Sequence, residues 1–124
     1  MAGPDPLAVF DALFHAACVE RDPDAFIALW ADDDDITMWG SDLDERATGA
    51  DQIEALGEAI TASPFALFFH WDERQAHVEG DTAWVNAAGT LSVDGRTSAY
   101  RVTGVLLRRH DEWRWHTFNG CEPN

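Results

Sequence analysis

Residues 101–109 read RVTGVLLRR and residues 112–119 read EWRWHTFN, with His110-Asp111 between them. Two runs of alternating apolar and polar residues around a short charged turn predict a β-hairpin. Successive side chains of a strand point to opposite faces of the sheet. One face of this hairpin is therefore predicted to carry Arg101, Thr103, Val105, Leu107, Trp113, Trp115, Thr117 and Asn119.

That predicted face is apolar along most of its length and carries a few polar groups. Such a mixture is typical of the wall of a ligand cavity. It is equally typical of a core that contains a satisfied polar cluster, and both interpretations stay open. The sharpest candidate is Arg101, because a guanidinium among apolar neighbours needs a partner. That partner is either a ligand oxygen or Asp42, Asp44 or Glu45 from a loop over the mouth of the cavity.

The rest of the chain predicts helices followed by strands. Asp5-Pro6 and Asp22-Pro23 each combine a capping acid with a proline in the first turn, which indicates two helix starts. A third helix is expected after Thr48-Gly49-Ala50-Asp51, ending at Ser63-Pro64. Residues 36–39 predict a short strand, residues 40–49 a polar loop, and residues 65–78, 82–93, 98–109 and 112–119 four long antiparallel strands. We therefore expect one α+β domain over residues 1–124.

Composition limits the classes of partner. The chain of 124 residues has a formal net charge of −15, and all eight of its basic residues are arginine. Residues 1–62 carry fifteen acidic residues against two arginines, whereas residues 63–124 carry eight against six. This charge argues against nucleic acid and anionic membranes as partners, and the lack of lysine excludes a lysine Schiff base. No signal peptide or long apolar span is visible, so a cytoplasmic location is expected.

Several segments together resemble the NTF2-like superfamily and its SnoaL-like domains. They are residues 28–34 (ALWADDD), 39–49 (WGSDLDERATG), 80–85 (GDTAWV), 101–106 (RVTGVL) and 113–118 (WRWHTF). The resemblance covers nearly the whole chain, in the right order. It implies a cystatin-like cone in which three helices pack on a curved antiparallel sheet around an internal pocket, in a protein that is usually dimeric.

The steroid isomerases of that superfamily can be compared residue by residue. Their oxyanion tyrosine corresponds to Phe14, their catalytic aspartate to Met38 and their second acid approximately to Thr103. None of these three side chains can take the corresponding role, so the resemblance argues against an isomerase mechanism. An acid or base for another reaction would have to come from Asp42, Asp44, His15 or Tyr100.

Other candidate residues have two interpretations each. Asn119 and Thr117 either orient a ligand oxygen or form a polar strand end, and Trp39 and Tyr100 either line the pocket or belong to the core. The acidic run 32–35 lacks the alternation of a calcium loop, and the two cysteines form neither a zinc site nor a disulfide framework. No metal and no cofactor are expected. The pocket candidates are thus Arg101, Asn119, Thr103, Thr117, Trp39, Met38, Phe14 and Tyr100.

One further pattern indicates association. In residues 65–71 (FALFFHW) both alternating faces are apolar, although helices can cover only one face of the sheet. We therefore expect a homodimer through the open sheet face. The sequence favours a domain that binds an apolar or weakly acidic small molecule. A non-enzymatic association module, and a lyase, isomerase or hydrolase acting on a small carbonyl or hydroxyl compound, remain alternatives.

Overall fold

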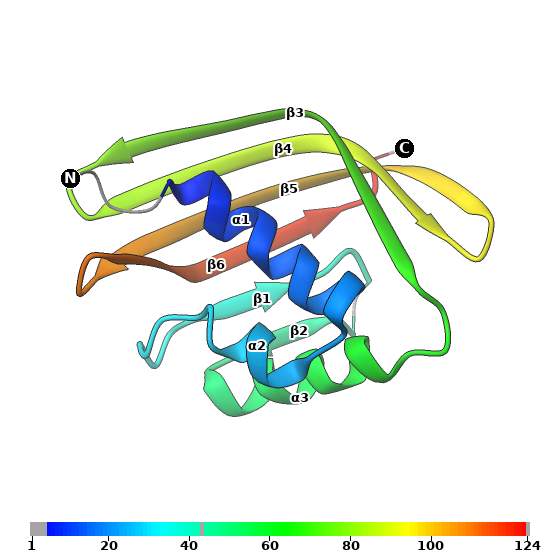
Figure 1. Ribbon diagram of the computed structural model, residues 1–124, viewed down its shortest axis with the longest axis horizontal. Helices are drawn as coiled ribbons and strands as arrows, with labels where there is room; N and C mark the ends of the chain where they lie inside the picture. The colour runs from blue at the N-terminus through cyan, green and yellow to red at the C-terminus, as the bar shows by residue number, and fades with distance from the viewer. Residues whose placement is uncertain (1–4, 43, 124) are drawn as a thin grey trace.

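The computed structural model describes residues 5–42 and 44–123. It shows the α+β architecture that the sequence predicts, with helices packed on one face of a curved six-stranded sheet (Figure 1). The elements in chain order are α1 (Pro6–Phe14), η1 (His15–Glu20, a π-helical turn), α2 (Pro23–Ile27), β1 (Thr37–Trp39), β2 (Arg46–Thr48), α3 (Ala50–Ala62), β3 (Leu67–Glu79), β4 (Thr82–Val93), β5 (Arg96–Arg109) and β6 (Glu112–Cys121). None of the described helices is long and apolar enough to cross a bilayer.

The helix ends follow the predicted capping chemistry. The carboxylates of Asp5 and Asp22 accept backbone N–H groups at the starts of α1 and α2, each followed by proline. At the other end of the π-helical turn, Arg21 donates through its guanidinium to the carbonyl oxygens of Thr61 and Ser63. Because these carbonyls lie at the C-terminus of α3, Arg21 fastens η1 to α3 and positions both helices over the sheet.

The sheet has the strand order β2-β1-β6-β5-β4-β3. Its contacts are antiparallel except that β1 runs parallel to β6. β2 lies within residues 40–49, which the sequence predicts as a loop; that expectation is corrected by the pairing of Thr37 with Thr48 and of Trp39 with Arg46. A strand of three residues gives too short a pattern to distinguish from a loop.

Two bulges set which side chains face the helices. In β6, Val105 pairs with Thr117 but Leu106 pairs with Trp115, so His116 is an extra residue. The bulge shifts the alternation by one residue, so that Trp115 and Phe118 both point into the core. Gly104 faces Trp115 closely: a Cβ at that glycine would lie 2.5 Å from the indole ring.

The register of the hairpin corrects the predicted face, because Leu106 pairs with Trp115 and Arg108 pairs with Trp113. On β5 the buried positions include Tyr100, Val102 and Leu106, whereas Arg101 and Thr103 are exposed. The odd-numbered residues of β5 share a face with Thr117 and Asn119 but not with Trp113 and Trp115. The face that carries Arg101 is therefore the outer face of the sheet, turned away from the helices.

The second bulge lies in β3, where the pairing shifts between Trp71 and Glu73. Here β3 approaches β4 so closely that a Cβ on Gly89 would lie 1.8 Å from the carbonyl oxygen of His70. Only glycine fits such an approach. The strand bends (Figure 1), and its first part curves toward α3 so that Leu67 and Phe69 face the helices.

Candidate functional site

A cavity of about 240 Å³ lies between the helices and the sheet. Its floor and walls are apolar and come from α1, η1, α2, α3 and the inner face of the sheet. These side chains are Leu13, Phe14, Ala17, Cys18, Phe26, Met38, Leu56, Ile60, Leu67, Phe69, Leu91, Val93 and Phe118. An apolar hollow with a few polar groups at one place is the usual composition of a small-molecule site.

The polar groups of the cavity come from three separate segments. Ser41, Asp42 and Glu45 belong to the loop between β1 and β2, Tyr100 to β5, and Glu122 follows the end of β6. We call these five residues the acidic rim. None of the described residues that line this cavity is cationic. The rim is therefore an uncompensated negative group beside an apolar hollow.

Hydrogen bonds from neutral donors hold the rim together. The backbone N–H of Asp42 donates to Oε1 of Glu45 over 3.1 Å, and the hydroxyl of Ser41 donates to Oε1 of Glu122 over 2.9 Å. The hydroxyl of Ser98 donates to the other oxygen of Glu122 over 3.4 Å. These donors thus orient both carboxylates without neutralising their charge.

Burial changes the acidity of two rim groups. It raises the pKa of Glu45 above its usual range; the backbone hydrogen bond from Asp42 opposes this effect, and the negative charges of Asp42 and Asp44 add to it. Burial also raises the pKa of Tyr100 to about 12, opposed by hydrogen bonding with Ser41 and reinforced by the charges of Glu45, Glu122 and Asp42. Tyr100 therefore stays a neutral phenol. A carboxyl with a raised pKa is suited to exchanging a proton with a bound molecule.

The aromatic walls form a connected set around Phe69. Its ring lies 4.8 Å from that of Phe14, 5.5 Å from that of Trp71 and 5.3 Å from that of Tyr100, measured between centroids. Tilted, stacked and edge-on contacts of this kind fix ring orientation. The phenol of Tyr100 is thereby held with its hydroxyl end at the rim.

Three of the eight pocket candidates line the cavity: Phe14, Met38 and Tyr100. The other five, Arg101, Thr103, Thr117, Asn119 and Trp39, do not. Arg101, Thr103 and Asn119 are exposed on the outer face, and the indole of Trp39 is 42% exposed with the Arg46 guanidinium 5.3 Å above it. The expectation that Arg101 points into the pocket is corrected by the hairpin register, which places Trp113 and Trp115 on the face of the even-numbered residues of β5. Arg101 lines a shallow outer groove together with Glu73, Gln75 and Asn86.

The rim carboxylates are only partly visible in the sequence. The 40–49 segment is expected over the mouth of the cavity. Asp42 and Glu45 do line the cavity there, but Arg101, their expected partner, does not. Asp44 is exposed and His15 pairs with Glu20 at the surface, so neither lines the cavity. Glu122 carries no signal, because β6 extends to Cys121, beyond the predicted end of that strand.

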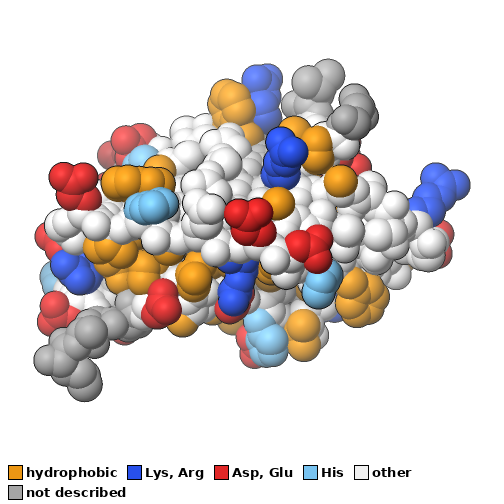
Figure 2. Space-filling model, turned by 90° about the horizontal axis from the view of Figure 1, so that it is seen from above, with side chains coloured by type: hydrophobic (Ala, Val, Ile, Leu, Met, Phe, Trp, Pro, Cys, Tyr) orange, Lys and Arg blue, Asp and Glu red, His pale blue; other side chains and the backbone are white. Residues whose placement is uncertain are grey.

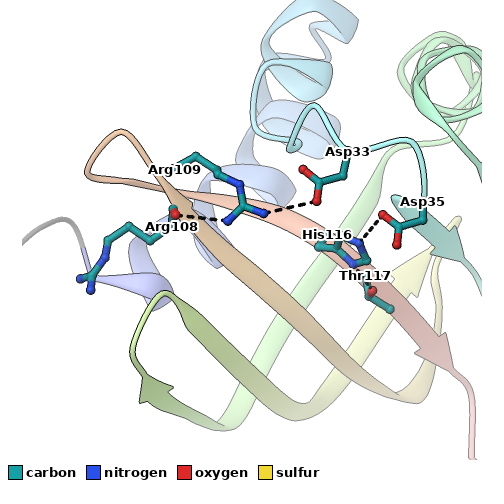
Figure 3. A network of polar contacts seen from close by, with 6 residues as sticks. All are labelled: Asp33, Asp35, Arg108, Arg109, His116 and Thr117. Atoms are coloured by element: carbon teal, nitrogen blue, oxygen red, sulfur yellow. Dashed lines mark hydrogen bonds and ion pairs between the residues drawn. The ribbon is translucent and has the colours of Figure 1, made fainter.

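A second polar cluster lies outside the cavity, where the acidic run meets β6 (Figure 3). Nε2 of His116 lies 2.8 Å from Oδ1 of Asp35, and Nδ1 lies 2.7 Å from the hydroxyl oxygen of Thr117. Arg109 donates to Asp33 over 3.3 Å. Among the described residues, Asp33, Asp35 and His116 are the group whose ligand atoms come within 4.8 Å of one another. Because Arg109 and His116 already pair with these carboxylates, the cluster acts as an ionic clasp between the 32–35 loop and the sheet.

The fold agrees with comparisons to known proteins. The chain belongs to the SnoaL-like domain family, whose model matches residues 7–117. No curated protein matches the chain. A candidate dehydratase of the NTF2-like family from Streptomyces avermitilis has a similar structure, with a TM-score of 0.86 at 17% identity over 96% of this chain and 94% of that one.

Two further solved structures carry different descriptions. A candidate calcium/calmodulin-dependent protein kinase type II association domain from Thiobacillus denitrificans gives a TM-score of 0.80 at 22% identity, over 100% of this chain and 99% of that one. A candidate ketosteroid isomerase from Parabacteroides distasonis gives 0.73 at 19% identity, over 93% and 86%. Identities this low show a shared fold, and the chemistry must come from the residues of this chain.

Proposed function

We propose that this SnoaL-like protein binds a small, largely apolar molecule in its cavity and holds the polar end of that molecule at the acidic rim. The observation that carries the proposal is the division of the cavity into apolar walls and one polar edge. Apolar walls supply the affinity, while the phenol of Tyr100 and the carboxyl of Glu45 fix the orientation. The positions that the isomerases use do not support their reaction here, since Phe14 and Met38 carry no acid or base and Thr103 lies on the outer face.

A cavity-filling variant tests this proposal. Leu56 lines the cavity from α3, and its neighbour Ala55 is exposed on the same helix. We expect Leu56→Trp to abolish binding of 2-phenylethanol, observed by saturation-transfer NMR, and Ala55→Trp to leave it unchanged. Equal binding to both variants, or no binding to the natural protein, would overturn the proposal.

A second candidate function, association through the outer sheet face, has its own observation. Phe68 is 65% exposed and Trp84 is 40% exposed, and their register places both on the outer face, where Trp84 stacks on His77. Large exposed apolar groups on a sheet face are typical of interfaces. Seen from above, onto the β3 edge of the sheet, hydrophobic side chains form separate groups among charged ones (Figure 2).

We propose that a second copy of the chain covers this face. The double variant Phe68→Glu/Trp84→Glu is expected to convert a dimer to a monomer in light scattering after size exclusion. Val19→Glu is the matched control, because Val19 is 68% exposed on η1, among the helices. A natural protein that runs as a monomer at micromolar concentration would contradict this second candidate.

A further inference from the structure

We infer that the molecule bound in the cavity carries a protonated amine, which lies against the half-buried carboxylate of Glu45, with the negative charges of Asp42 and Glu122 nearby on the rim. This inference rests on the proposed function and adds the chemical class of the ligand. It replaces the weakly acidic ligand that follows from the sequence when Arg101 is placed inside. With Arg101 on the outer face, all the charge that lines the cavity is negative.

The first supporting observation is that these carboxylates have no cationic partner among the described residues. The ion pairs of the described chain involve other acids, namely Glu20, Asp72, Asp11, Asp81, Asp33, Glu112 and Asp35. The donors that reach Glu45 and Glu122 are a backbone amide and two hydroxyls, all neutral. Asp42 and Glu122 are exposed, whereas Glu45 is half-buried. A charge that is partly removed from water, as that of Glu45 is, is stabilised by an opposite charge, which an ammonium group would supply.

The second observation concerns the state of Glu45. The carboxyl of Glu45 is half-buried. The lack of a side chain at Gly40 lets Glu45 pack closely, since a Cβ on Gly40 would lie 3.0 Å from Cδ and Oε2 of Glu45. Burial and the neighbouring carboxylates raise its pKa, so its ionised form is disfavoured at this position. An ammonium group would remove that penalty. Amine affinity should therefore increase as the pH rises and Glu45 ionises.

The third observation separates an organic cation from a metal ion. Phe14, Phe69 and Phe118 line the same cavity as the rim residues, and the faces of aromatic rings attract ammonium groups. A bare metal ion would leave these walls unused. In the described chain, the ligand atoms that converge as a metal would require belong to the ionic clasp, away from this cavity.

Three probes that share a phenyl ring test the inference by calorimetric titration: 2-phenylethylamine, 2-phenylethanol and 3-phenylpropionate. We expect the amine to bind about tenfold more tightly than the alcohol, and the carboxylate to bind more weakly than both. Raising the NaCl concentration should weaken binding of the amine and leave that of the alcohol unchanged.

Variants identify the groups that are responsible. Glu45→Gln and Glu122→Gln are each expected to lower affinity for the amine about fivefold or more and to leave affinity for the alcohol unchanged. Glu54→Gln, an equal change of charge at an exposed position of α3, is the matched control and should alter neither.

The outcomes separate the inference from the proposed function. Equal affinity for amine and alcohol, or amine binding that is insensitive to both rim variants, would overturn the inference and leave the apolar pocket standing. Absence of binding for all three probes would overturn both.

Discussion

The phenol oxygen of Tyr100 lies directly above the α-carbon of Gly120, so closely that a Cβ on this glycine would be 2.1 Å from the oxygen. The two residues belong to neighbouring strands, β5 and β6, and their contact sets how far the phenol projects toward the rim. Glycine at position 120 therefore makes room for the phenol of Tyr100, although it has no side chain to contribute.

Gly120→Ala is expected to displace the Tyr100 ring and to destabilise the fold by about 1–3 kcal/mol, the usual cost of overpacking. In a Tyr100→Phe background the worst contact is gone, so the same substitution should cost less. A double-mutant cycle by urea denaturation measures this coupling, which we expect to be at least about 0.5 kcal/mol. Strictly additive costs would show that the two residues are not in contact in solution.

Glu45→Gln is expected to change how stability depends on pH. The folded state raises the pKa of Glu45, so ionising this group costs folding free energy as the pH rises through that value. Below 4.5, its ordinary value, the carboxyl is protonated in both states and the cost vanishes. The variant should therefore gain stability relative to the natural protein between about pH 4 and pH 7.

Urea denaturation across that pH range measures the effect, and Glu54→Gln controls for the change in net charge. The amide oxygen that the substitution introduces can still accept the N–H of Asp42, so the loop geometry should survive. A stability difference that stays constant with pH would contradict the perturbed titration of Glu45.

Cys18 is expected to report on occupancy of the cavity. It lines the cavity, and burial raises the pKa of its thiol to about 11, a shift that the positive charge of Arg21 partly opposes. At neutral pH very little of the reactive thiolate is present. In a Cys121→Ser background, N-ethylmaleimide should modify Cys18 slowly, and saturating 2-phenylethanol should slow it further.

Mass spectrometry of the modified protein gives both rates. The exposed Cys121, studied in a Cys18→Ser background, is the control and should react at a rate that the alcohol does not change. Rapid modification of Cys18, or no protection by the alcohol, would count against an enclosed site at this position.

Asp35→Asn should test the ionic clasp. The hydrogen bond from His116, and then its charge, lower the pKa of Asp35, so the pair stabilises the folded state above 3.8 and loses that effect as the pH falls below it. The stability advantage of the natural protein over Asp35→Asn should be present at about pH 5 and disappear toward about pH 2. Asp34→Asn is the neighbouring control; an identical pH profile for both variants would contradict the clasp.

The sequence is sufficient to predict the fold because its signals there are local and repeated. Asp5-Pro6 and Asp22-Pro23 mark helix starts, and the Asp94-Gly95 turn has the positive φ values, 50° and 77°, that this dipeptide favours in a hairpin. Each of these features depends on residues close in the chain. They can be recognised without knowing which residues from other elements pack against them.

The site is harder to predict because the pairing register of a hairpin and a bulge leave little local signature in the sequence. Arg109 lies opposite Glu112 across the turn, so Trp113 and Trp115 share a face with the even-numbered residues of β5. The extra residue at His116 then moves Thr117 to the other face of β6. Gly104 is the available clue: it looks like a weak strand residue, but its missing side chain makes room for Trp115. Glu122 cannot be found from the sequence, since its position depends on how far β6 extends.

The cavity has walls from one set of elements and an edge from another. The hydrophobic walls hold the helices against the sheet, whereas the acidic rim comes from the β1–β2 loop, one residue of β5 and the segment after β6. Under the proposed function, substitutions at the acidic rim change which polar group of a ligand is accepted, while the walls continue to support the fold. Relatives that share this scaffold can thus diverge in what they recognise through a handful of changes, at little cost to their ability to fold.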